Sequence, residues 1–92
     1  MTDYYLMYGG EIDRRRKFTG IANARKAAMK EIRQGMNVNA IVPADNGRYQ
    51  FLWVNKIRTG VYQVFIEYWS GSKGKFVSAK LNDDGTLFKG KR

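Results

Sequence analysis

The 92-residue sequence contains no cysteine and no histidine. The absence of cysteine excludes disulfides, iron–sulfur clusters and thiol chemistry, and the absence of both residues excludes zinc sites built from Cys and His ligands. Catalytic triads and general bases that depend on histidine are excluded for the same reason. The remaining side chains form no catalytic constellation, so we expect no enzyme activity, no cofactor and no metal site.

Long hydrophobic runs are also missing from the chain. No segment approaches the ~18–20 apolar residues of a membrane span, and residues 1–8 lack the apolar run of a signal peptide. A chain without cysteine suits a reducing compartment. We therefore expect a cytoplasmic protein that makes no membrane contact.

The length and composition predict one small domain over residues 1–92. Apolar residues make up 43% of the chain and charged residues 27%, which is typical of a soluble globular protein. No internal repeat, low-complexity block or interdomain linker divides the chain, whose length is that of a single domain. We expect residues 89–92, with Lys89, Lys91 and Arg92, to form a frayed basic tail.

Acidic residues are scarce, with 8 Asp and Glu against 17 Lys and Arg, for a net charge of +9. The excess is unevenly spread along the chain. Residues 14–33 hold eight basic side chains against Glu31 alone, whereas residues 1–13 hold three acids and no base. This asymmetry indicates a basic surface on one part of the fold and an anionic partner.

The hydrophobic pattern predicts an α+β fold, with a single helix packed on a four- to five-stranded, largely antiparallel sheet in the order β-α-β-β-β-β. The helix is expected between Thr19, a favourable N-cap, and Gly35, which suits the left-handed position after the last turn. Its apolar stripe has helical spacing and consists of Ile21, Ala24, Ala28 and Ile32. Residues 11–17 are polar, and we expect a loop there. The expected strands are residues 4–8, 40–42, 48–57, 61–69 and 76–81. Whether residues 86–88 add a short edge strand is left undecided.

The loop Arg58-Thr59-Gly60 decides which side chains share a face of the longest hairpin. A three-residue loop that ends in glycine fits a type I turn with a G1 bulge. In that register one face is aromatic and consists of Tyr49, Phe51, Trp53, Phe65 and Trp69, with Trp53 opposite Phe65 and Tyr49 opposite Trp69. The other face is available to the helix and consists of Leu52, Val54, Tyr62, Val64, Ile66 and Tyr68. A two-residue turn would shift the register by one and remove the aromatic face, but threonine disfavours the positive φ of such a turn.

Two basic clusters are candidate phosphate contacts. The first is the run Arg14, Arg15, Arg16 and Lys17, and the second is the helix face formed by Lys26, Lys30 and Arg33. Arginine clusters bind phosphate through charged hydrogen bonds, and the run precedes a helix start, whose free N–H groups favour anions. The alternative is that both clusters are solvated surface whose charge aids solubility.

Three interpretations of the aromatic set stay open. Aromatic rings on a sheet surface stack unpaired bases in proteins that bind single strands. An exposed apolar patch also marks a protein partner, and the rings could equally be core, the commonest environment of aromatic residues in small domains.

We therefore expect a non-enzymatic nucleic-acid-binding module that contacts the phosphate backbone of DNA or RNA through the basic run and helix face. Residues 89–92 would add a flexible contact. The alternative is a protein-binding module, such as an inhibitor encoded by a phage or mobile element that blocks a nucleic-acid-handling enzyme of its host. In that case the basic rim would meet an acidic protein surface, and the aromatic residues would supply the buried anchors.

Overall fold

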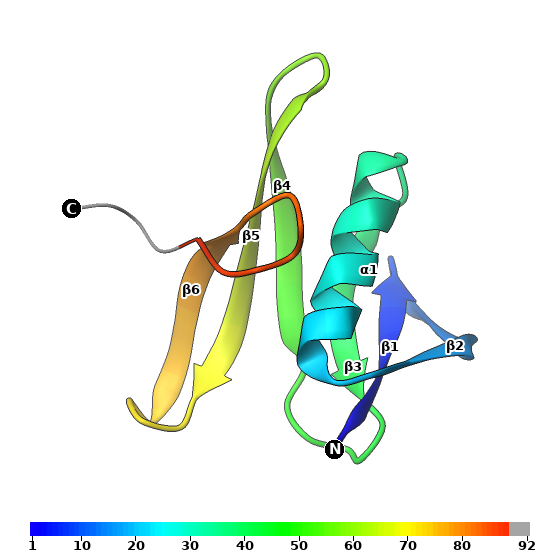
Figure 1. Ribbon diagram of the computed structural model, residues 1–92, viewed down its shortest axis with the longest axis vertical. Coiled ribbons are helices and arrows are strands. Elements are labelled where there is room, and N and C mark those ends of the chain that lie inside the picture. The colour runs from blue at the N-terminus through cyan, green and yellow to red at the C-terminus, as the bar shows by residue number, and fades with distance from the viewer. Residues whose placement is uncertain (89–92) are drawn as a thin grey trace.

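A computed structural model describes residues 1–88 and shows one helix packed on a six-stranded antiparallel sheet (Figure 1). The predicted α+β class is confirmed, with more strands than the four to five expected. The elements are β1 (Asp3–Tyr8), β2 (Glu11–Thr19), α1 (Ile21–Arg33), β3 (Val38–Pro43), β4 (Gln50–Arg58), β5 (Val61–Ser70) and β6 (Lys75–Leu81). Across the sheet the strands run in the order β2-β1-β3-β4-β5-β6. The short edge at 86–88 is a single bridge from Leu87 to Leu81, and the expected tail, residues 89–92, lies outside the described residues.

The additional strand is β2, so the expected loop at residues 11–17 is wrong. Tyr8 pairs with Glu11 across a tight turn in which Gly9 has a φ of 66°. β2 lies at the edge of the sheet, and most of its side chains are exposed. Backbone pairing with β1 holds most of this strand, so it needs no buried face. Its sequence therefore lacks the alternating apolar pattern by which a strand is recognised.

The basic run Arg14–Lys17 bulges out of β2. Tyr4 pairs with Phe18, and the next paired position joins Leu6 to Asp13. A single residue separates the two positions on β1, whereas the whole run separates them on β2. The run is therefore longer than the stretch of β1 that it faces. A bulged and charged edge strand resists pairing with another chain, which gives the run a structural role independent of any ligand.

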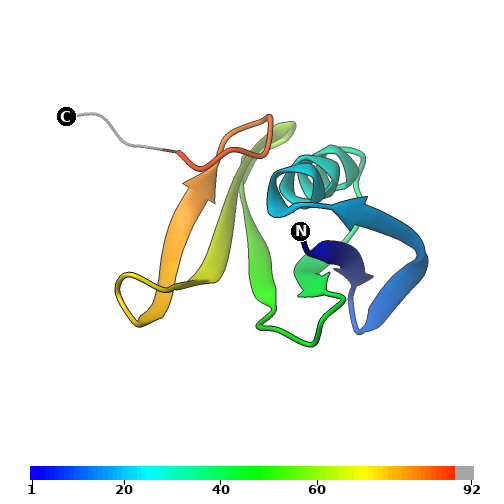
Figure 2. The same ribbon diagram turned by 60° about the horizontal axis from the view of Figure 1, so that its bottom comes forward.

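Helix α1 lies against one side of the sheet, over β1, β2 and β3 (Figure 2). Its predicted apolar stripe is largely confirmed, because Ala24, Ala28 and Ile32 are buried and Met29 joins them. The small alanine side chains let the helix backbone approach the sheet closely. The sheet side of this core consists of Leu6, Val38, Ile41, Leu52, Val64, Ile66 and Leu81.

The two ends of the helix differ in how well the sequence predicts them. Thr19 is not the N-cap, because it is the last residue of β2 and its hydroxyl donates a hydrogen bond to Asp3 Oδ1 at 3.0 Å. Gly20 takes the N-cap position with a φ of 84°, and no side chain caps the helix. At the other end Gly35 follows the last turn with a φ of 91°, as expected, and its N–H donates to the Ile32 carbonyl at 3.0 Å.

The β4–β5 hairpin has the predicted register, with Trp53 opposite Phe65. The register shifts between Lys56 and Arg58, and Gly60 has a φ of 80°. These are the features of the G1 bulge expected for a turn that ends in glycine. One face of the hairpin therefore contributes to the core under the helix, and the opposite face carries the aromatic rings.

The turn after β6 closes directly over the helix. Asp84 shapes this turn by accepting hydrogen bonds from the backbone N–H and the hydroxyl of Thr86, at 3.0 and 2.6 Å. Gly85 follows with a φ of 87°, and a Cβ at this position would lie 2.6 Å from the backbone nitrogen of Lys26. The close approach and the backbone conformation both require glycine.

We expect Gly85→Ala to lower the free energy of unfolding by about 2–4 kcal/mol, because a strained φ alone costs ~1–3 kcal/mol and the turn must also move off the helix. Urea unfolding followed by circular dichroism measures this change. Gly71→Ala is the matched control, since a Cβ at Gly71 would meet no atom within 4 Å. Equal stabilities of the two variants would contradict the close contact.

Candidate functional site

The side of the sheet opposite α1 carries no helix within residues 1–88 (Figure 2). Because side chains alternate between the two faces of a strand, the pairing register identifies the residues that share this open face. One row across the sheet from β1 to β6 consists of Met7, Ala40, Phe51, Glu67 and Ser78. The rows on either side of it contain Trp53, Phe65 and Lys80, and Trp69 and Phe76.

Aromatic rings dominate the part of the open face formed by β4, β5 and β6. We call this surface the aromatic face, and it consists of Tyr49, Phe51, Trp53, Phe65, Trp69 and Phe76. Trp53 is 45% exposed, Phe51 42% and Phe76 40%. Phe51, Trp53 and Trp69 of the predicted aromatic set are therefore not core residues, whereas Tyr49 and Phe65 are half-buried. Base stacking and a protein interface remain as interpretations of the exposed rings.

The rings of the aromatic face contact one another in pairs. Trp53 and Phe65 stack, with ring centroids 5.8 Å apart and planes 20° apart. Trp69 meets Phe76 edge to face at 5.3 Å. Sequence reasoning missed Phe76, because only the pairing of β6 with β5 brings it opposite Trp69.

A guanidinium group lies directly on the aromatic face. Arg48 Cζ is 3.9 Å from the ring centroid of Trp69, a short cation–π contact. The expected pairing of Tyr49 with Trp69 is not formed as a strand pair, because β4 begins one residue later, and the Tyr49 ring packs at 6.0 Å from Phe51 instead. Arg48, the cation that lies on the Trp69 ring, is a site residue that sequence reasoning missed.

Two further cations belong to the same side of the sheet. Lys80 on β6 pairs with Phe65, and the Arg14 guanidinium lies 5.3 Å from the ring centroid of Tyr5, on β1. Arg14 is the member of the predicted basic run that reaches this side. Arg48 and Lys80 thus border the aromatic face, and Arg14 adds positive charge farther across the same side of the sheet, over β1.

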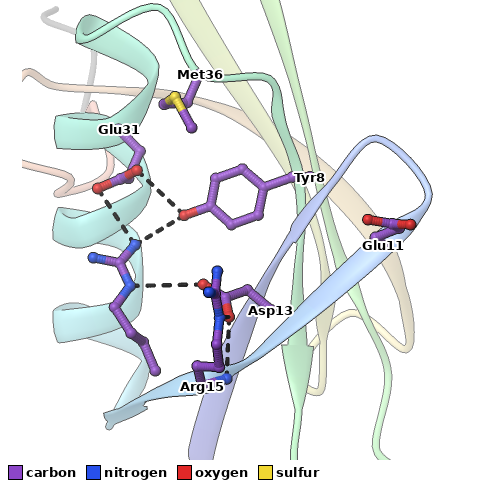
Figure 3. Close-up of a pocket in the computed structure, with 7 residues that line it drawn as sticks. Tyr8, Glu11, Asp13, Arg15, Glu31 and Met36 are labelled. Carbon is purple, nitrogen blue, oxygen red and sulfur yellow. Dashed lines mark hydrogen bonds and ion pairs between the residues drawn. The ribbon is translucent and has the colours of Figure 1, made fainter.

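The middle of the basic run belongs to a network of ion pairs next to the helix (Figure 3). Arg15 Nε lies 3.1 Å from Asp13 Oδ1, and Arg16 lies 3.8 Å from the other oxygen of the same carboxylate. Arg16 also pairs with Glu31 on α1 at 3.4 Å and donates to the Tyr8 hydroxyl at 2.9 Å. The charge of these two arginines is therefore partly balanced within the protein.

The contacts of the run shift two pKa values. Hydrogen bonds from Arg15, chiefly from its backbone and next from its side chain, lower the pKa of Asp13, and burial raises the pKa of the Tyr8 hydroxyl.

Lys17 completes the run with an ion pair to Asp3 at 3.8 Å. Exposed ion pairs such as these contribute only ~0–1 kcal/mol each, so an external anion could displace them.

The basic helix face lies on a different surface from the run. Lys26, Lys30 and Arg33 line a hollow of about 290 Å³ together with Asp83 and Asp84 of the turn that closes over the helix. Arg33 lies 4.0 Å from the Asp83 carboxylate. The two basic clusters therefore line separate hollows, and acids accompany both.

Arg25 joins the helix to the central strands. Its Nε and Nη2 donate to Gln50 Oε1 at 3.2 and 2.9 Å, and its guanidinium lies 5.2 Å from the ring centroid of Tyr68. Burial lowers the pKa of this guanidinium, which still remains far above neutrality. Arg25 is thus a structural cation under the helix, and it does not belong to the open face.

Comparisons of the chain with protein-family models, with curated proteins and with solved structures found no match. Between residues 1 and 88 no helix is long and apolar enough to cross a membrane. The same part of the chain brings together no cluster of acidic side chains that could hold a metal ion. The candidate site is therefore defined by the geometry of the open face.

We expect Trp53→Ala and Trp69→Ala to retain the fold, because both rings are substantially exposed. Each variant should lose less than about 1.5 kcal/mol of unfolding free energy. Ile66→Ala is the comparison on the opposite face of β5, where the side chain is fully buried, and it should lose about 2–5 kcal/mol. Urea unfolding of the three variants checks this order. If either Trp variant were unfolded in buffer, the rings would be part of the core.

The pKa of Asp13 should be below the ordinary value of about 3.9. Contacts that favour the carboxylate stabilise the fold above about pH 4, and this contribution is lost as the pH falls through the lowered pKa of the folded state. Arg15→Ala should raise the pKa of Asp13, whereas Arg14→Ala should leave it unchanged because Arg14 lies on Tyr5 instead. Carboxyl NMR titration measures the shift, and an Asp13 pKa that does not respond to Arg15→Ala would contradict the assigned cause.

Proposed function

We propose that this protein is a non-enzymatic nucleic-acid-binding module whose aromatic face stacks the bases of a single strand. The observation that carries the proposal is the placement of Arg48 on Trp69, within a set of exposed rings on the open side of the sheet. Aromatic rings interleaved with cations supply the two contacts that a single strand needs, stacking for its bases and positive charge for its phosphates.

A single strand fits this surface better than a duplex does. The bases of a duplex present their faces to one another, whereas an unpaired base offers a free face to Trp53 or Phe51. Stacking on aromatic side chains contributes ~1–3 kcal/mol per base and is tolerant of sequence. Arg48 and Lys80 border the rings and would each meet a phosphate of the bound strand, and Arg14 would contact a third phosphate where the strand continues toward β1.

The predicted basic run and helix face have a secondary part in this proposal. Arg15 is 91% exposed despite its ion pair with Asp13, so its charge still contributes to the positive field around the protein. With a net charge of +9, that field would raise the rate at which a polyanion arrives. We therefore assign steering to these clusters and base contact to the aromatic face.

A protein partner is the competing function, and the hairpin tip favours it. All residues from 53 to 62 are exposed, and four large hydrophobic side chains there lie away from the aromatic face or at the tip, namely Val54, Ile57, Val61 and Tyr62. A partner protein that enclosed this arm would bury both of its faces. An inhibitor of a nucleic-acid-handling enzyme could bind in this way, with its basic borders meeting an acidic surface.

Binding to labelled single- and double-stranded oligonucleotides, measured by fluorescence anisotropy, tests the proposal. We expect a preference for single strands and a loss of about tenfold in affinity for Trp53→Ala, the equivalent of one stacked base. Three phosphate contacts predict a further loss of about twentyfold between ~50 and ~200 mM salt. Tyr62→Ala is the matched control, because this exposed ring lies on the opposite face of the same hairpin and should not affect binding.

Two results would contradict the proposal. Absence of binding to every oligonucleotide at low salt would remove nucleic acid as the ligand. Binding that depends on Arg15 and Lys30 but not on Trp53 would move the contact from the aromatic face to the basic clusters beside the helix.

A further inference from the structure

Glu67 lies at the centre of the aromatic face. It pairs with Phe51 on β4 and with Ser78 on β6, and two residues away along β5 lie Phe65 and Trp69 on the same face. Its side chain is half-buried. A carboxylate is thus surrounded by aromatic rings on the surface that the proposed function assigns to bases.

This carboxylate differs from the acids that pair with cations elsewhere in the fold. Asp3, Asp13, Glu31 and Asp83 all lie within 4.0 Å of a lysine or arginine. Within residues 1–88 Glu67 makes no such ion pair and accepts no side-chain hydrogen bond. Its acceptor capacity is therefore available to a ligand bound on the aromatic face.

The charge of Glu67 determines which part of a single strand can approach it. A phosphate at the centre of the face would meet a like charge at close range, which is unfavourable. The edge of a base that donates hydrogen bonds would instead gain charged hydrogen bonds, which are stronger than neutral ones. With Arg48 and Lys80 at the borders, the face would hold phosphates at its rim and base edges at its centre.

We propose that Glu67 makes the site selective for bases that carry an amino group, and this inference rests on the proposed function. Cytosine and adenine each offer an exocyclic amino donor, and guanine offers an amino group beside a ring N–H. Uracil and thymine offer one N–H between two carbonyl oxygens, which repel a carboxylate. A base stacked on Phe51 or Phe65 has its edge next to Glu67, because cross-strand and same-face neighbours lie only ~5–7 Å apart.

Selectivity between oligo(dC) and oligo(dT) of equal length, measured by anisotropy at low salt, tests this role. We expect the natural protein to bind oligo(dC) about tenfold more tightly than oligo(dT). Glu67→Gln should reduce that ratio to about twofold or less, mainly by tightening the binding of oligo(dT), because an amide both donates and accepts. An exocyclic amine then no longer confers an advantage.

Glu11→Gln is the matched control. It removes the same charge from an exposed position opposite Tyr8 at the edge of the sheet. Both variants gain in long-range attraction for a polyanion, but only Glu67→Gln should change the ratio between the two oligonucleotides. Circular dichroism spectra of the two variants should match that of the natural protein, since neither side chain is fully buried.

The outcomes separate failure of this inference from failure of the proposed function. Binding of both oligonucleotides with a ratio that Glu67→Gln leaves unchanged would overturn the role of Glu67 while nucleic-acid binding stands. No binding of either oligonucleotide would overturn both. Binding of a Lys- and Arg-rich peptide in place of the oligonucleotides, lost in Glu67→Gln, would make the face a site for cationic side chains and would also overturn both.

Discussion

The contact of α1 with one side of the sheet constrains the rest of the molecule. Ala24, Ala28 and Ile32 bury the helix against β1, β2 and β3, and the turn at Gly85 approaches the helix backbone from the side of β6. One helix of 13 residues cannot cover both faces of a six-stranded sheet. The part of the other face that β4, β5 and β6 form is consequently accessible to solvent, and its large exposed side chains are aromatic.

The distribution of charge follows from the same arrangement. On the helix side, Arg15 and Arg16 of the bulged edge strand and Arg33 of α1 have acidic neighbours, as the contacts of Arg16 with Glu31 and of Arg33 with Asp83 illustrate. On the open side, Arg48 rests on an aromatic ring and Glu67 has no cationic partner among residues 1–88. Several charges on the helix side are therefore paired within the protein, whereas Arg48 and Glu67 on the open side make no ion pair among residues 1–88.

The register of the β4–β5 hairpin connects these surfaces to the turn chemistry. A left-handed Gly60 and a bulge before Arg58 place Trp53 opposite Phe65. A slip of one residue would move one strand's side chains to the opposite face, and Trp53 would then compete with Leu52 for the core. The aromatic face, with Glu67 at its centre, depends on that local geometry.

The sequence by itself determined the α+β class, the helical stripe, the hairpin register and the aromatic identity of one hairpin face, because these depend on short-range periodicity and turn chemistry. It did not determine β2, since an edge strand held by backbone pairing needs no apolar pattern. Only the tertiary structure decided that Trp53 is exposed, that Arg48 lies on Trp69, and that acids accompany the basic clusters beside the helix. Each of these features depends on which distant strands become neighbours in the sheet. Burial of hydrophobic side chains under a single helix determines that arrangement of strands.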